Sequence, residues 1–382
     1  MSAKKSLRQV MKKAVFGGER LPNRFFLAQT EPQQEVVVWL LVAGKPIDVT
    51  RRHCQASGLP FTICIEFTRG QAPSESERSR VKLRLCENGG ANRVLSEIDL
   101  DYQETLECGE SEFLLFRARR SVNYCLPRLR LWRHNLWHTY VTSRGKIHAP
   151  AAQVRAMAAL FCCPRPVSLI SVADEEGKGN IYPLNVMGDL NRDYFGFCLK
   201  HNYLPEKFVQ QTRRVVLSSV PMKQGPIAYL LGPNHNRPTI DWKQLPFATR
   251  PSRIFKIPVP LFACRVRELE VERVHRLGYH TLFLARVLSD ERLAQVPELC
   301  VAHGFYQDWR VRNLGVDKRQ AAAGDLYVRS PISRESAERI SAQSEQIGDP
   351  WKLEASIAVP VPGRQGSGAN IFDGQSKVLE KD

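Results

Sequence analysis

The sequence contains no long hydrophobic run, because its longest uninterrupted stretch of strongly apolar side chains covers only residues 36–42. A membrane-spanning helix needs roughly 20 such residues, so no membrane span is expected. Residues 1–20 are basic and lack the apolar segment of a secretory signal. We therefore do not expect export by that route.

Several chemical signatures are also missing. None of the ten cysteines stands in a C-x-x-C spacing, which favours reduced thiols and a cytoplasmic location over a zinc site or a disulfide framework. The patterns G-x-S-x-G, G-x-x-x-x-G-K-[ST] and G-x-G-x-x-G are absent as well. Hydrolase, P-loop and Rossmann interpretations therefore lose their usual support.

Acidic residues are in short supply, with 39 Asp and Glu against 55 Lys and Arg and a net charge of +16. Residues 113–173 hold ten Arg and Lys and no acid, interleaved with Tyr124, Trp132, Trp137 and Tyr140. Such a stretch has three possible explanations. It could bind single-stranded nucleic acid, it could bind an anionic ligand or an acidic partner, or its arginines could lie over a solvated face. Nucleic acid is the least favoured of the three.

The composition is otherwise that of an ordinary globular protein, with 43% apolar and 25% charged residues. The length of 382 residues allows two domains. We expect a basic arm over residues 1–20, a β-rich domain over 21–150, a second β-rich domain over 151–314 and a polar extension over 315–382. The extension would be helical from Ser333 and then disordered. No internal repeat is evident.

The first β-rich region has short runs rich in β-branched and aromatic residues, separated by turn-forming residues. These runs predict strands at residues 35–42, 61–67, 81–85, 94–100 and 112–118. Val81, Leu83 and Leu85 alternate with Lys82 and Arg84, as in a half-exposed strand. The region is therefore expected to form an antiparallel, sandwich-like domain.

The second region carries a more specific pattern. Residues 167–172 predict a strand, 174–177 a tight turn, 180–187 a second strand and 194–199 a third. The segment that opens with Arg-Pro-Val at 165–167 and continues through Asn-x-x-Pro at 180–183 resembles the flavin reductase-like family of FMN-binding split barrels. Residues 261–266, 278–287 and 303–306 are similar to three later landmarks of that family, in the same order. The resemblance covers residues 155–310.

This resemblance implies a mainly β fold, an FMN-binding split barrel preceded by the antiparallel domain, and a homodimer with flavin at the subunit boundary. It implies FMN as cofactor, with NADH or NADPH as co-substrate. The residues it places at the cofactor are Arg165, Asn180, Tyr182, Pro183, Leu184, Asn185, Lys200, His201, Asn202 and Tyr203.

Physical chemistry supports part of this assignment. Lys200, His201 and Asn202 end a strand just before Pro205, where a helix is expected to begin. A helix N-terminus beside a cation suits a phosphate. Two residues depart from the family pattern: Asn185 stands where the family usually has Ser, and the segment 200–207 lacks its Thr.

His280 is the candidate catalytic residue, because the resemblance places it near flavin and nicotinamide. The alternative is a strand histidine satisfied by backbone groups. Hydride transfer is chemistry of the cofactors themselves, so no nucleophile need be visible. The function expected is an FMN-dependent oxidoreductase that takes hydride from NAD(P)H and passes electrons to free flavin, a partner oxygenase or a small acceptor. The alternatives are a flavin- or anion-binding module without turnover, and a nucleic-acid-binding protein with a degenerate barrel.

Two further features leave alternatives open. His134 and His138 have the i, i+4 spacing of a metal pair on a helix, although no third ligand is in view; a helix flank is the preferred interpretation, and no metal is expected. Trp242 and Phe247 lie in a long loop that could either cover a flavin ring as a lid or pack against the body.

Overall fold

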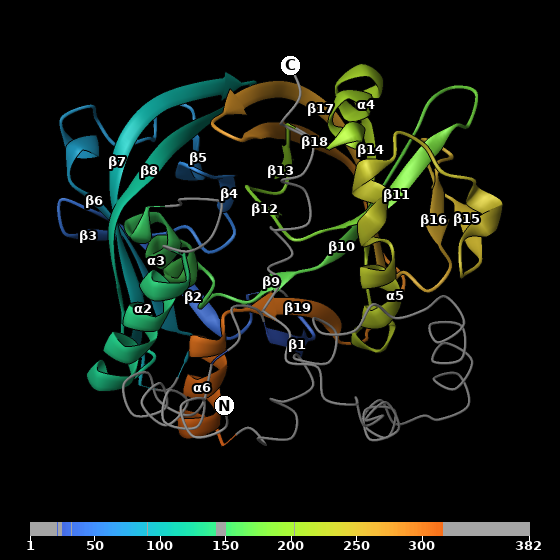
Figure 1. Ribbon diagram of the computed structural model, residues 1–382. Helices are drawn as coiled ribbons and strands as arrows, with labels where there is room; N and C mark the ends of the chain where they lie inside the picture. The colour runs from blue at the N-terminus through green and yellow to red at the C-terminus, as the bar shows by residue number, and fades with distance from the viewer. Residues whose placement is uncertain are drawn as a thin grey trace, which may run out of the picture.

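The computed structural model describes residues 21, 25–31, 33–89, 91–142, 150–201 and 203–315, with the backbone alone for 137–142. Figure 1 shows two curled sheets side by side, with β4 and β12 meeting near the middle. We call them the N-sheet and the C-sheet. Each has seven strands. The mainly β fold and the antiparallel N-terminal part are therefore as expected.

The N-sheet contains every strand expected in the first region. Its members are β2 (Val36–Val42), β3 (Lys45–Asp48), β4 (His53–Gly58), β5 (Phe61–Thr68), β6 (Val81–Glu87), β7 (Val94–Cys108) and β8 (Ser111–Asn123). They pair antiparallel in the order β3-β2-β6-β7-β8-β5-β4. Alternate residues of β2 are buried, which is the pattern of a strand with one face on the core.

The C-sheet contains the strands expected from residue 167 onward. Its members are β10 (Ser168–Ala173), β11 (Gly179–Leu184), β12 (Met187–Asp189), β13 (Tyr194–Lys200), β14 (Arg214–Ser219), β17 (Arg265–Leu277) and β18 (His280–Arg292). They pair antiparallel in the order β11-β10-β14-β17-β18-β13-β12. Numbered along the chain, the strand order is the same in both sheets.

The last hairpin of each sheet matches in detail. β7 and β8 are joined through Gly109 (φ 55°), and β17 and β18 through Gly278 (φ 54°). The ladder shifts at 99/100 and 102/104 in the first hairpin, and at 268/269 and 271/273 in the second. Each ladder shift in the first hairpin is separated from its counterpart in the second by the same number of residues that separates Gly109 from Gly278. The expectation of no internal repeat is therefore wrong at the level of the fold, because the topology repeats where few residue identities do.

A buried apolar cluster joins the two sheets. The N-sheet supplies Cys54, Ala56, Cys64, Leu106, Phe113 and Leu115, and the C-sheet side supplies Leu190, Tyr194, Cys198, Leu282 and Leu284. A Cβ at Gly196 would lie 2.5 Å from the sulfur of Cys54. This position therefore needs glycine, because β4 passes directly over β13.

Other elements cross between the halves. A small sheet in the order β1-β19-β9 combines β1 (Phe25–Gln29), β19 (Glu298–Ala302) and β9 (Arg165–Pro166). Helices α3 (Ala151–Leu160) and α6 (Gly304–Asn313) contribute Leu160 and Phe305 to the core of the N-sheet. Helices rather than a second sheet thus cover the N-sheet, and packing crosses the division expected at residue 150 in both directions.

The remaining elements lie on the outside of these layers. They are α2 (Arg128–Thr142), α4 (Leu204–Thr212), α5 (Gly225–Leu230), the short helices η1 (Glu77–Ser79), η2 (Met222–Gln224), η3 (Gly232–Asn236) and η4 (Trp242–Gln244), and the pair β15 (Thr249–Pro251) and β16 (Pro258–Pro260). None of the helices in the described part of the chain has the length and apolar character needed to cross a membrane. The N-terminal arm and nearly all of the C-terminal extension lie outside the described residues.

Candidate functional site

The end of β13 gathers several of the expected cofactor residues. Lys200 is the cross-strand partner of His280 at the start of β18. The amide of His201 donates to the carbonyl of Tyr279 at 3.1 Å. The amide of Tyr203 donates to the carbonyl of Lys200 at 3.0 Å. The chain is thereby folded back into α4, whose first turn contains Pro as expected. Asn202 lies outside the described residues.

His235 joins this group, although no sequence pattern had indicated it. It lies in η3, and its ring stacks on Tyr203 with centroids 4.3 Å apart and an interplanar angle of 28°. Its Nε2 lies 3.0 Å from the carbonyl oxygen of Pro183. Because a carbonyl only accepts, Nε2 carries the proton and Nδ1 is left as an acceptor. We call Tyr182, Lys200, His201, Tyr203 and His235 the β13-end cluster.

Three polar atoms of the β13-end cluster are buried without a hydrogen-bond partner among the described residues. They are the Tyr182 hydroxyl, His201 Nε2 and His235 Nδ1. A buried polar group without a partner costs about 1–3 kcal/mol. The Lys200 ammonium lies 5.6 Å from the centroid of the Tyr203 ring. The cluster therefore combines one cation with several unmet donors and acceptors, as a polar, anionic ligand requires.

His280 is buried against the N-sheet, with 7% of its surface exposed. Its Nδ1 accepts the amide of Gly58 at 3.3 Å and lies 3.5 Å from the Ser57 hydroxyl. A Cβ at Gly58 would lie 3.0 Å from Cε1 of the ring. The structure thus agrees with the alternative in which a backbone group satisfies this histidine. Nδ1 accepts the hydrogen bond from the Gly58 amide, so the proton of the ring is on Nε2.

A buried carboxylate sits behind the β13-end cluster. Glu206, in the first turn of α4, is 2% exposed and accepts the hydroxyl of Thr281 at 2.6 Å. The amide of Gln210 also donates to it, at 2.5 Å. The bond from Thr281 joins α4 to β18 next to His280, and the bond from Gln210 lies within α4.

Other expected cofactor residues are engaged elsewhere. The Asn180 amide donates to the backbone carbonyls of Asn234 and Arg237 at 3.0 and 2.6 Å, so it anchors the η3 loop. Leu184 belongs to the core of the C-sheet. Asn185 is half-buried in the connection between β11 and β12.

Arg165 lies at the boundary between the sheets. Its Nη1 donates to Gln55 at 2.9 Å, and its guanidinium stacks 3.4 Å from the centre of the Phe161 ring. It lines a hollow of about 20 Å³ that His53 and Asp189 also line. That volume accommodates a single water rather than a ligand. Arg165 therefore does not line the β13-end cluster.

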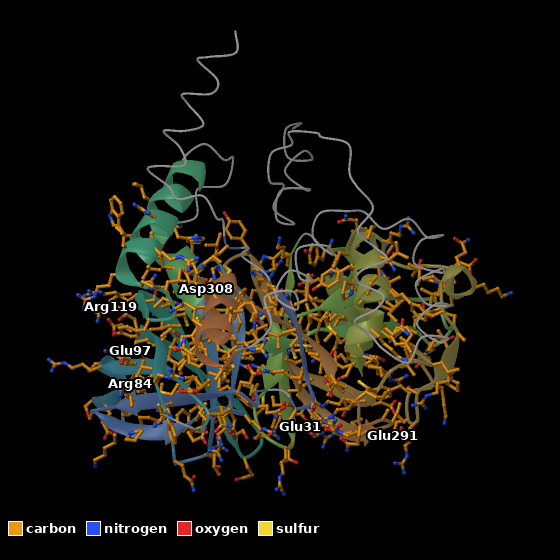
Figure 2. The ribbon with its side chains drawn as sticks, turned by 90° about the horizontal axis from the view of Figure 1, so that it is seen from below. Glu31, Arg84, Glu97, Arg119, Glu291 and Asp308 are labelled. Carbon is orange, nitrogen blue, oxygen red and sulfur yellow. The ribbon has the colours of Figure 1, made fainter. Side chains whose placement is uncertain are left out.

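Carboxylates pair with two arginines of the basic stretch. On α2, Arg130 pairs with Asp308 at 2.9 Å, and on β8, Arg119 pairs with Asp101 at 3.6 Å (Figure 2). Trp132 remains 57% exposed. The Arg130–Asp308 pair joins α2 to α6.

The two remaining alternatives are also resolved in part. His134 packs on Phe305 with ring centroids 4.6 Å apart, the side chain of His138 lies outside the described residues, and the described residues contain no group of three metal ligands. Trp242 donates from Nε1 to the carbonyl of Gly177 at 3.0 Å, and Phe247 contacts Phe262 edge-on at 5.1 Å. The loop that carries Trp242 and Phe247 is packed down.

Comparison with known proteins finds similar chains among the solved structures. Neither the protein-family models nor the curated proteins gave a match. An NADH:FAD oxidoreductase of Streptomyces globisporus is 16% identical, with a TM-score of 0.36, over 42% of this chain and 95% of its own. The flavin reductase of the styrene monooxygenase of Pseudomonas putida S12 is 20% identical, with a TM-score of 0.32, over 39% and 92%.

A third structure is an FMN-binding protein of Thermus thermophilus, 24% identical with a TM-score of 0.31 over 34% of this chain and 71% of its own. These neighbours are flavin reductases and FMN-binding proteins. They are proteins of the kind that the motifs between residues 155 and 310 resemble. The likeness is one of fold and covers about 40% of the chain.

Two histidines, the buried His280 and the half-buried His235, make stability depend on pH. Burial, assisted by the charge of Lys200, lowers the pKa of His235 to about 4, and the same causes together with His201 lower the pKa of His280 to about 4. The ordinary value is about 6.5. Between pH 6.5 and 4 the unfolded chain thus binds protons that the folded protein does not, so stability falls as the pH falls.

We expect the free energy of unfolding in urea to drop by about 2 kcal/mol per histidine between pH 7 and pH 5. The variant His235→Gln keeps a donor at the position of Nε2 and should lose less stability over this range than the parent. An unchanged pH profile in this variant would show that His235 is not the group responsible.

Proposed function

We propose that this protein binds FMN at the β13-end cluster and acts as an oxidoreductase of the flavin reductase type. It would take hydride from NADH or NADPH and pass electrons to free flavin, a partner oxygenase or a small acceptor. The observation that carries the proposal is a set of three buried polar atoms that have no hydrogen-bond partner among the described residues and that belong, like Lys200, to the β13-end cluster. Of the residues involved, Tyr182, Lys200 and His201 are among those that the resemblance places at the cofactor.

The residues present suit each part of the ligand. Lys200 would neutralise the phosphate, and His201 Nε2 would complete its hydrogen bonds. His235 Nδ1 would accept a hydrogen bond that a hydroxyl of the sugar chain donates. Asn185, half-buried between β11 and β12, would face the pyrimidine edge of the ring.

When bound, the flavin itself supplies the hydride-accepting chemistry. The chain's own task is to bind it, orient it and exclude water. His280 acts as a positioning residue in this proposal, because its ring ties the start of β18 to Gly58 and lies next to Lys200. The chain needs no nucleophile or general base of its own for the reaction.

A second candidate is a flavin-binding protein without turnover. The observation that favours it is the cover over His280, whose ring is enclosed by the Ser57–Gly58 segment. A nicotinamide would have to approach from another side of the flavin. The two candidates therefore agree on the ligand and differ in the reaction.

Anaerobic mixing of the FMN-loaded protein with each nicotinamide tests the proposal. We expect the visible flavin absorbance to bleach with NADH or with NADPH, at a rate that saturates with nicotinamide concentration. Chemical reduction with dithionite serves as the positive control. A flavin that dithionite bleaches and neither nicotinamide does would reject the enzyme and favour the binding protein.

A further inference from the structure

We propose that this chain is a fused pair of split barrels that functions as a monomer with one flavin site. The N-sheet takes the place that a partner subunit would occupy. It packs against His280 and the turn between β17 and β18, beside the β13-end cluster, and lacks the corresponding site of its own. The statement about the ligand rests on the proposed function; the statement about the pair does not.

The first argument is the repeated topology. Both sheets have the same strand order, all pairs are antiparallel, and the final hairpins share their glycine turn and both irregularities. Even a backbone bond recurs: the amide of Arg69 donates to Glu110 at 2.8 Å, and that of His201 donates to Tyr279 at 3.1 Å. The two donors are in corresponding positions. Arg69 directly follows β5, which pairs with β8, and His201 directly follows β13, which pairs with β18.

The second argument is the reciprocity of the contacts between the halves. In a two-fold pair each surface meets its own counterpart, so every contact occurs twice. The turn at Gly109 approaches the hydroxyl of Tyr194 near the start of β13. The turn at Gly278 approaches Leu59 and Pro60 just before β5. The two hairpin tips thus reach corresponding places in opposite halves.

The third argument is that the shared face is buried within one chain. Phe113 and Leu115 of β8 correspond to Leu282 and Leu284 of β18, and all four are fully buried in the same cluster. In a homodimer built on this face, that cluster would have to be open to a second copy. The face that would pair two separate barrels is already covered.

The fourth argument is the asymmetry between the two corresponding sites. Lys200 pairs with His280 across the strands, whereas the corresponding pair in the N-sheet is Thr68 with Ser111. In place of α4 the N-sheet has a loop with the three-residue helix η1. The hydroxyl of Ser111 donates to the buried carboxylate of Glu66 at 3.0 Å.

Charge separates the two places further. Arg69 is bonded to Glu107, and Glu112 accepts the amide of Gly70 at 3.1 Å. The carboxylates of Glu66, Glu107 and Glu112 outnumber the guanidinium groups of Arg52 and Arg69 here, which disfavours a phosphate. Of the two corresponding places, the one beside Lys200 therefore suits an anionic ligand.

The N-sheet nevertheless contacts residues that lie beside the β13-end cluster. The Ser57 hydroxyl donates to the carbonyl of Leu277 at 3.1 Å, and the amide of Gly58 donates to His280. These contacts come from the half that corresponds to a partner subunit. The homodimer expected from the resemblance is thus replaced by an interface inside the chain.

Light scattering after size exclusion tests the pair without any ligand. We expect the full chain to have the mass of one protomer, 43.4 kDa, across a hundred-fold range of concentration. A stable mass of twice this value would overturn the inference. A protein with the mass of one chain that does not bind FMN would support the fused pair and reject the proposed function. Failure of the inference about the pair and failure of the proposed function are thus distinguishable.

Equilibrium dialysis with FMN tests the asymmetry. We expect one FMN per chain at saturation. Lys200→Gln should raise the dissociation constant at least ten-fold, whereas the matched change Thr68→Ala at the corresponding place should leave it within two-fold. Two FMN per chain, or an equal loss in both variants, would overturn the single site.

Discussion

Replacing Gly278 with alanine is expected to lower the free energy of unfolding by about 3 kcal/mol. Gly278 has φ 54°, and a Cβ there would lie 2.1 Å from the carbonyl oxygen of Leu59 and 2.5 Å from Cδ of Pro60. The same carbonyl accepts the amide of Tyr279 at 3.1 Å. The added methyl group would push apart the backbones that join the two halves. Urea unfolding followed by circular dichroism measures the change.

The corresponding glycine supplies a matched control. Gly109 has φ 55°, but a Cβ there would meet only the hydroxyl of Tyr194, at 3.1 Å. Gly109→Ala should therefore cost about 1 kcal/mol, the price of the left-handed backbone alone. The difference of about 2 kcal/mol reports the close approach of Gly278 to the other half. Equal losses in the two variants would show that the halves do not meet as described.

Removing the charge of Lys200 is expected to weaken FMN binding about ten-fold to a hundred-fold. A hydrogen bond to a charged group contributes about 1.5–3 kcal/mol, and 1.4 kcal/mol corresponds to a factor of ten. Riboflavin has the same ring and sugar chain and no phosphate. Lys200→Gln should therefore leave the affinity for riboflavin almost unchanged. Quenching of flavin fluorescence measures both ligands.

Lys207 on α4 is the control for non-specific charge. It is exposed and lies in the same helix as the buried Glu206, one turn from the β13-end cluster. Lys207→Gln removes the same charge and should change FMN affinity by less than two-fold. If Lys200→Gln weakens FMN and riboflavin alike, the lysine supports the fold of the site and does not contact the phosphate.

Much of the fold could be predicted from local patterns. The alternation in residues 81–85 and the apolar run at 36–42 became β6 and β2, because one face of each strand is buried. The repeat could not be seen in the same way. Across the final hairpins only a few positions keep their residue, among them Leu100 with Leu269 and Gly109 with Gly278. Strand order depends on long-range pairing, which tolerates such divergence.

The candidate site was predicted in part, for a related reason. Lys200, His201 and Tyr203 are neighbours in sequence, so their approach follows from a strand that ends before a helix. His235 reaches Pro183 across 52 residues, and His280 meets Gly58 across 222. No local pattern indicates such contacts. The burial of His280 in particular depends on the N-sheet, whose role as a partner was not apparent from its residues.

The most direct test of the central claim is whether the protein retains FMN. The full chain is incubated with excess FMN, passed through a desalting column, and the flavin absorbance of the protein fraction is compared with that of Lys200→Gln treated identically. We expect the parent to elute yellow with one flavin per chain and the variant to elute with much less. A colourless parent protein would contradict the assignment of the β13-end cluster as a flavin site.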